Sequence, residues 1–123
     1  MNRVHRWLCN SSLWRKAVEE AILPWALEGI ALKGDVLEVG PGPGVTTSIL
    51  CKRVERLTCI EIDPARAGAL DRKMSGGNVT VVQEDATRMS FADASFDNAV
   101  CFTMLHHVPS VALQNQLLCE AAR

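Results

Sequence analysis

Glu38 is followed by Gly40, Gly42 and Gly44 in the stretch "DVLEVGPGPGVTTSIL", which begins at Asp35. Because glycine has no side chain, its backbone can come into contact with a ligand. The prolines between the glycines fix φ and reduce the entropy lost when such a loop becomes ordered. This pattern predicts a loop that binds a ligand through its backbone, and the acid Glu38 favours a ligand with a cationic end. A tight turn that binds nothing is the alternative.

Two further acids follow apolar stretches. Glu61 lies near the end of "RLTCIEI", 61 − 40 = 21 residues after the first glycine. At this spacing a carboxylate can accept hydrogen bonds from both hydroxyls of a ribose. Asp85 and Ala86 follow "VTVVQ", and the Asp85 carboxylate could accept a hydrogen bond from the exocyclic amine of an adenine. The alternatives are a solvated charge for Glu61 and a turn residue for Asp85, while Asp63 is best explained as a helix cap.

The glycine loop differs from two common nucleotide-binding loops. A phosphate-binding P-loop ends in Lys followed by Ser or Thr, and Val45 and Thr46 supply no lysine. The dinucleotide pattern GxGxxG would require glycine at position 45, where the chain has valine. These differences argue against a P-loop and disfavour a dehydrogenase.

The composition is that of one small folded domain. The chain has 123 residues, of which 48% are hydrophobic, and a net charge of -1. The chain therefore lacks the surplus of basic residues that is typical of nucleic-acid binders, so we expect no nucleic-acid partner. The five cysteines form no CxxC pair, and with no secretory signal they predict a reduced, cytoplasmic location. The first residues, "MNRVHRWLCNSSLW", lack a continuous apolar core, so no membrane span is expected, and no metal site is predicted.

Strands and helices must alternate to position these residues. Strands are predicted at "VLEV", "RLTCIEI", "VTVVQ" and "FDNAVCFTML" (residues 96–105). Helices are predicted over residues 45–54, from Pro64 onward, and from Ser110 with Leu113 and Leu117 on one face. This rhythm predicts right-handed crossovers and a mostly parallel sheet, so the fold class is α/β. Ligands of such open sheets bind outside the carboxyl ends of the strands, where the glycine loop lies.

A separate helix is predicted near the N-terminus. Its apolar face comprises Leu13, Trp14, Ala17, Val18, Ala21, Ile22 and Trp25. Asn10, Ser11 or Ser12 could cap this helix, and Pro24 should break or kink it. We expect the face to pack on the body of the domain. The alternative is a lid over a pocket, with aromatic walls from Trp7 and Trp14.

From about Asp35 onward the chain resembles the class I S-adenosylmethionine-dependent methyltransferases, with a type 11-like pattern. The stretches "LEVGPGPG", "CIEIDP", "VVQEDATRMSF" and "FDNAVCFTMLHHVPS" occur in the order and spacing of that family. The resemblance implies a Rossmann-like fold with flanking helices, S-adenosylmethionine as cofactor, and methyl transfer as the activity. The sulfonium already activates the methyl group, so the reaction needs mainly alignment and exclusion of water.

The resemblance also implies a role for each matching residue. The methionine part of the cofactor would be held by Glu38, Gly40, Gly42 and Gly44. Glu61 would hold the ribose, Asp85 and Ala86 would hold the adenine, and Thr103 would border the sulfonium and the substrate.

The resemblance is incomplete at the C-terminal side. Members of the family have further strands after the helix near Ser110, whereas this sequence ends at Arg123. We therefore expect an N-terminal helical segment (1–34), the cofactor-binding half of a methyltransferase domain (35–123), and poor catalysis by this chain alone.

An incomplete sheet would also leave an edge uncovered. In the family's order, which is third, second, first and fourth strand, the fourth strand would be that edge, and self-association is the expected result. Along it, one side is predicted to carry Ala99, Cys101 and Thr103, and the other Val100, Phe102 and Met104.

The methyl acceptor is less well defined by the sequence. The first motifs also resemble the ribosomal RNA adenine dimethyltransferases, which carry an Asn-(Leu/Pro)-Pro-aromatic signature after the fourth strand. Here the segment is "FTMLHHV", which together with the charge favours a small-molecule or lipid-like acceptor. His106 or His107 could act as a general base, although packing, capping or solvation would equally explain them. A ribosomal RNA enzyme and a non-catalytic cofactor-binding fragment or subunit are the alternative functions.

Overall fold

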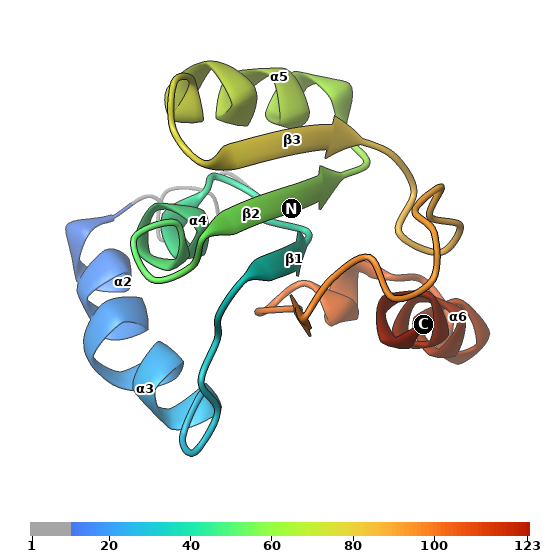
Figure 1. Cartoon of the computed structure of the whole chain (residues 1–123), viewed down its shortest axis with the longest axis horizontal. Helices are drawn as coiled ribbons and strands as arrows, with labels where there is room; N and C mark the ends of the chain where they lie inside the picture. The colour runs from blue at the N-terminus through green and yellow to red at the C-terminus, as the bar shows by residue number, and fades with distance from the viewer. Residues whose placement is uncertain (1–10) are drawn as a thin grey trace.

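The computed structural model describes residues 11–123 and consists of a parallel sheet with helices on both faces (Figure 1). The strands are β1 (Asp35–Val39), β2 (Arg56–Glu61), β3 (Val79–Gln83) and β4 (Asn98–Val100). They lie in the order β3-β2-β1-β4, and every neighbouring pair is parallel. The predicted α/β class and strand order are therefore confirmed.

The helices between and after the strands begin where the sequence predicts. They are α4 (Val45–Leu50), α5 (Pro64–Met74) and α6 (Val111–Ala122). The short 3-10 helix η2 (Leu105–His107) was not predicted, because its first residue falls in the strand expected over residues 96–105. The Asp63 carboxylate accepts from the first free N–H groups of α5, and the Ser110 hydroxyl accepts from the Leu113 N–H in α6. These caps satisfy backbone donors that have no partner within the helix.

Helix α4 is shorter than predicted, since it ends at Leu50 and not at residue 54. The chain turns here because the Asn78 amide donates to three carbonyl groups of the turn, those of Cys51, Val54 and Glu55, at 2.9–3.2 Å. These bonds replace the helical hydrogen bonds that the carbonyls would otherwise accept.

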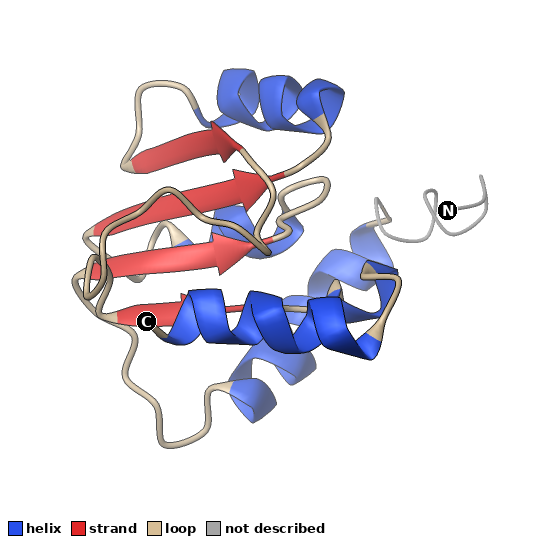
Figure 2. Ribbon diagram, turned by 90° about the vertical axis from the view of Figure 1, so that its right-hand side faces the viewer, coloured by secondary structure: helices blue, strands red, loops and turns tan. Residues whose placement is uncertain are grey.

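Two apolar cores lie on opposite faces of the sheet. Val36 of β1 belongs to the core under α4, α5 and the N-terminal helices, and Leu37 and Val39 belong to the core under α6. Figures 1 and 2 show the N-terminal helices and α6 on different sides of the sheet. Because successive side chains of a strand alternate between faces, the central strands β1 and β2 contribute to both cores.

The N-terminal segment is helical but not uniformly α-helical. Helix α2 (Ser12–Ala17) continues into the π-helix η1 (Val18–Ile22) and then α3 (Leu23–Ala26). The Leu23 N–H bonds to the Val18 carbonyl, five residues back, just before Pro24. The Ser11 hydroxyl accepts from the Trp14 N–H at 3.1 Å, so Ser11 is the N-cap. The alternative cap Asn10 and the predicted wall residue Trp7 lie outside the described residues.

The predicted apolar face of this segment is only half right. Val18 is buried in the first core, and Trp14 and Ile22 pack against that core. Leu13 and Trp25, however, are 80% and 78% exposed, and Leu23, which was not predicted on this face, is buried. The π-turn places five residues where an α-turn places four, so the buried face shifts by about one residue past it. Trp14 packs against the first core and does not line a pocket, so the lid alternative gains no support from it.

The fourth strand is much shorter than the predicted 96–105. It pairs with β1 from Val36↔Asn98 to Glu38↔Val100, and the ladder stops there. Thr103 has φ 52°, a left-handed conformation incompatible with a strand. Met104 consequently lies in the second core with Cys101, whereas the alternation predicted it on the side of Val100, so that assignment was wrong.

Within residues 11–123, β4 is an edge strand, with β1 as its only strand partner. The same part of the chain contains no helix that is both long and apolar enough to span a membrane.

Candidate functional site

A pocket of about 310 Å³ lies at the carboxyl ends of β1, β2 and β3. Four of the predicted cofactor-binding residues line it: Gly40 after β1, Glu61 at the end of β2, and Asp85 and Ala86 after β3. Parallel strands bring these positions together because their carboxyl ends share one edge of the sheet. A larger cavity of about 580 Å³ near β4 and the end of α6 is lined by none of the predicted site residues.

Glu61 is held at the pocket by the backbone that follows it. Its side chain is buried, with the residue only 5% exposed, and its Oε1 accepts from the Asp63 N–H at 3.1 Å. This burial does not fit the alternative of a solvated charge. A carboxylate has about four acceptor positions, so Glu61 retains capacity for a ligand after this one bond.

Asp85 forms the predicted turn and also lines the pocket. Its Oδ1 accepts from the Thr87 N–H at 2.9 Å and from the Thr87 hydroxyl at 2.8 Å, which forms a turn after β3. The residue is nevertheless exposed and lines the pocket. The turn therefore fixes the carboxylate at the pocket wall.

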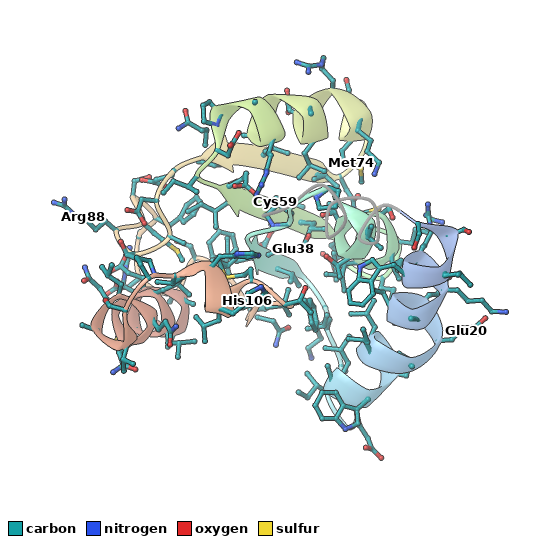
Figure 3. The ribbon with its side chains drawn as sticks, turned by 180° about the vertical axis from the view of Figure 1, so that it is seen from behind. Glu20, Glu38, Cys59, Met74, Arg88 and His106 are labelled. Carbon is teal, nitrogen blue, oxygen red and sulfur yellow. The ribbon has the colours of Figure 1, made fainter. Side chains whose placement is uncertain are left out.

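Glu38 does not join these residues. It is 1% exposed and lies on the face of β1 opposite to the pocket, near Cys59 of β2 (Figure 3). Its carboxylate accepts from the hydroxyls of Thr46 and Thr47, the latter at 2.7 Å, and from the Cys59 thiol at 3.5 Å. Glu38 thus ties the end of β1 to the first turn of α4, and the intervening glycine loop is fixed at both ends.

The pKa values of this buried cluster are set mainly by its burial. Burial raises the pKa of Glu38 above its ordinary value, because desolvation penalises the carboxylate. The bonds from Thr46, Thr47 and Cys59 oppose that rise. Burial, followed by the proximity of Glu38, likewise raises the pKa of the Cys59 thiol, so Cys59 is an unreactive core residue.

All three glycines of the loop have positive φ, but a side chain at each position would meet different surroundings. A Cβ on Gly40 would meet the Met104 side chain at 2.7–2.9 Å, and a Cβ on Gly44 would collide with Leu70. A Cβ on Gly42 would have no heavy atom within 4 Å other than those of Gly42 and its two chain neighbours. Gly40 and Gly44 are therefore required by protein packing, and Gly42 is the glycine that faces open space.

The remaining candidates lie after β4. Thr103 is exposed and does not line the pocket. His107 lines the pocket and His106 does not, although their rings are neighbours with centroids 4.0 Å apart. Figure 3 shows His106 on the segment that leads from β4 to α6. Of the two histidines, only His107 is placed to meet a bound molecule.

The opposite wall of the pocket is apolar and was missed by sequence reasoning. It is formed by Met104, Val108, Leu113 and Leu117, with Ile62 beside Glu61. The helical spacing of Leu113 and Leu117 predicts that they share one face of a helix, but the same spacing occurs whether that face covers a core or lines a pocket. Across residues 11–123, no group of three or more His, Cys, Asp or Glu side chains is arranged to hold a metal ion.

Comparison with known proteins gives a consistent assignment. The methyltransferase-domain family matches residues 37–123. The ribosomal RNA small subunit methyltransferase A of Desulfitobacterium hafniense is 28% identical over 91 residues, which are 74% of this chain and 32% of that protein. This chain thus spans about a third of the length of that relative.

Two solved structures share the fold. The N-methyltransferase NodS from Bradyrhizobium japonicum WM9, solved with S-adenosyl-l-homocysteine, has a TM-score of 0.75 and 22% identity, covering 97% of this chain and 60% of that one. The amino pentose methyltransferase CalS10 from Micromonospora echinaspora, solved with S-adenosylmethionine, has a TM-score of 0.70 and 20% identity, covering 98% and 51%. With the family match over most of the described residues, the chain belongs to the methyltransferase-domain family and has the class I S-adenosylmethionine-dependent methyltransferase fold.

Proposed function

We propose that the pocket at the strand ends binds S-adenosylmethionine and that the protein transfers its methyl group to an acceptor. The observation that carries this proposal is the convergence of Gly40, Glu61, Asp85 and Ala86 on one pocket. These residues come from three separate strand ends, and each matches a position that the family uses for the cofactor. The NodS structure was solved with S-adenosyl-l-homocysteine and the CalS10 structure with S-adenosylmethionine, and both support the same cofactor for this chain.

The chemistry of the lining fits an adenosine group. The Glu61 carboxylate would accept from the two ribose hydroxyls, and the Asp85 carboxylate would accept from the adenine amine, with Ala86 beside the ring. The apolar wall of Val108, Leu113 and Leu117 offers the nonpolar contact that a flat base requires. Such a mostly apolar pocket with a few fixed polar groups is typical of small-molecule sites.

The methionine part would lie along the glycine loop. Gly42 has open space beside it, which allows the backbone to approach the ligand. Glu38 is not in contact with the pocket, so we assign it the role of holding the loop through Thr46 and Thr47. A loop fixed at both ends loses less entropy when the ligand binds.

Methyl transfer itself asks little of the side chains. When bound, S-adenosylmethionine supplies an activated methyl group on a sulfonium. The residues of this chain would align the ligand and exclude water on the side of α6. His107, at the pocket rim, is the candidate to take a proton from the acceptor, and Thr103 would border the acceptor side.

We further propose that residues 35–123 form the cofactor-binding half of a methyltransferase domain and that residues 1–34 form an N-terminal helical segment. In support, β1 begins at Asp35 and the preceding described elements are helices. These helices share the first core with the sheet through Val18 and Leu23.

A small-molecule or lipid-like acceptor remains our first proposal. It is favoured by the net charge of -1 and by "FTMLHHV" in place of the nucleobase-binding signature. Ribosomal RNA is the second candidate, because the relative that matches 74% of this chain is named as a ribosomal RNA methyltransferase. Assaying transfer of labelled methyl to small amines, phenols and lipids, and in parallel to ribosomal RNA, separates the two.

Calorimetry with S-adenosylhomocysteine tests the cofactor site. Glu61→Ala should weaken binding by about 1–3 kcal/mol, because the ribose hydroxyls lose a charged acceptor. Glu61→Gln should lose less, since the amide oxygen still accepts one hydrogen bond. Glu55→Ala, which removes an exposed glutamate before β2, is the control and should bind like the parent. Equal affinities of Glu61→Ala and the parent would refute the ribose assignment.

A further inference from the structure

We propose that Met104 is a specificity-determining residue, whose side chain lies across Gly40 and must move aside before a ligand can reach the glycine loop. The inference rests on the proposed function, because it divides the cofactor pocket into two parts. The adenosine part is bounded by Glu61 and Asp85, and the part for the sulfur substituent lies at Gly40.

The contact between Met104 and Gly40 is the first observation. A Cβ built on Gly40 would lie 2.7 Å from Met104 Cγ, 2.9 Å from its Cβ and 2.9 Å from its Cε. Real Cβ atoms do not come this close to other carbons, so Met104 fills the space that a side chain at position 40 would need. The same side chain lines the pocket and is only half-buried. It therefore occupies the approach to Gly40 while remaining accessible.

The backbone before Met104 is the second observation. Thr103 has φ 52°, which is a strained conformation for a β-branched residue. This conformation turns Met104 from the face of Val100 and Phe102 to the face of the pocket. The Met104 carbonyl also accepts from the His107 N–H at 2.9 Å, which fixes the backbone at the start of η2.

These two observations have different consequences for the backbone and the side chain. The backbone of Met104 is held, but its unbranched side chain has several rotatable bonds and adapts readily. Movement is therefore confined to the side chain. A ligand that stops at the ribose leaves Met104 across Gly40, whereas a ligand with a sulfur substituent must displace it. The displacement reduces the apparent affinity of the longer ligand only.

Calorimetry of adenosine and S-adenosylhomocysteine with Met104→Ala tests this division. The variant should bind S-adenosylhomocysteine about three- to tenfold more tightly than the parent, since the population of open pocket rises. Its adenosine affinity should stay within about twofold of the parent. A fall in S-adenosylhomocysteine affinity would identify Met104 as a contacting wall and overturn the proposal, as would no change or an equal gain for both ligands.

A second pair of variants tests the same proposal without replacing Met104. Thr103→Gly removes the strain of the left-handed conformation that directs Met104, so it should shift the preference further toward adenosine over S-adenosylhomocysteine. Ala94→Gly is the matched control, because Ala94 has φ 56° and does not line the cofactor pocket. It should leave both affinities unchanged. If Thr103→Gly behaves like Ala94→Gly, Thr103 does not direct Met104 and the proposal fails.

The result also separates this inference from the proposed function. A parent chain that binds neither adenosine nor S-adenosylhomocysteine contradicts the cofactor site, and with it the role of Met104. A parent that binds both ligands, with no selective gain in Met104→Ala, contradicts the role of Met104 alone.

Discussion

Replacing Glu38 by Gln should change how the stability of the fold depends on pH. Glu38 is 1% exposed, and burial raises the pKa of its carboxyl from the ordinary 4.5 despite the bonds from Thr46, Thr47 and Cys59. The folded state therefore holds the proton more tightly than the unfolded state. The resulting stabilisation is fully present below the unfolded pKa and is lost as the pH rises through the folded pKa.

The magnitude follows from proton linkage. Between the unfolded and folded pKa of Glu38, the free energy of unfolding should fall by up to about 1.4 kcal/mol per pH unit. Glutamine has a similar shape and cannot ionise, so Glu38→Gln should lack this fall. The difference in unfolding free energy, variant minus parent, should consequently increase with pH above 4.5.

Urea unfolding of parent and variant from about pH 4 to about pH 8 measures this difference. Glu55→Gln is the matched control, because it makes the same chemical change at an exposed position and should keep the parental pH dependence. Parallel pH curves for Glu38→Gln and the parent would refute the reasoning, since they would mean that Glu38 has the same pKa in both states.

Glu38→Ala should be more damaging than Glu38→Gln at every pH. It leaves the hydroxyl of Thr47, a residue that is 0% exposed, without its acceptor at 2.7 Å. An unsatisfied buried polar group costs about 1–3 kcal/mol, and the vacated volume adds to that cost. If Glu38→Ala unfolded at the same urea concentration as Glu38→Gln, the hydrogen bonds of Glu38 would contribute nothing to stability.

Two further predictions concern the loop and the sheet edge. Gly44→Ala should destabilise the fold by about 1–3 kcal/mol more than Gly42→Ala in urea unfolding, because both residues have positive φ but only Gly44 would collide with Leu70. Gly42→Ala should instead weaken S-adenosylhomocysteine binding in calorimetry, and a reversal of this pattern would show that the loop approaches no ligand at Gly42. The chain should also self-associate through the edge of β4 that no strand covers within residues 11–123. Light scattering over a concentration series measures this association, and a monomer at every concentration would contradict the prediction.

The sequence by itself determined the elements whose causes are local. Asp63 before Pro64 and Ser110 before the last helix predict helix starts, because a side-chain oxygen caps the free N–H groups a few residues away. The alternation of strands and helices predicts a parallel sheet, since crossovers of this length join parallel strands. The position of Glu61 at a strand end then predicts that it lies near the glycine loop, which the pocket confirms.

Only the tertiary structure decided on which face of the sheet the side chains of Glu38 and Met104 lie. Glu38 belongs to the glycine motif in sequence, yet it lies on the other face of β1 from the pocket, where Thr46 and Thr47 satisfy its charge. Met104 lies on the pocket side because a single left-handed residue, Thr103, interrupts the alternation. Periodicity is a property of a regular backbone, so the strand alternation ends at the irregular φ of Thr103 and no longer predicts the side on which Met104 lies. Which conformation wins at such a residue depends on contacts with segments distant in sequence, and those contacts exist only in the folded chain.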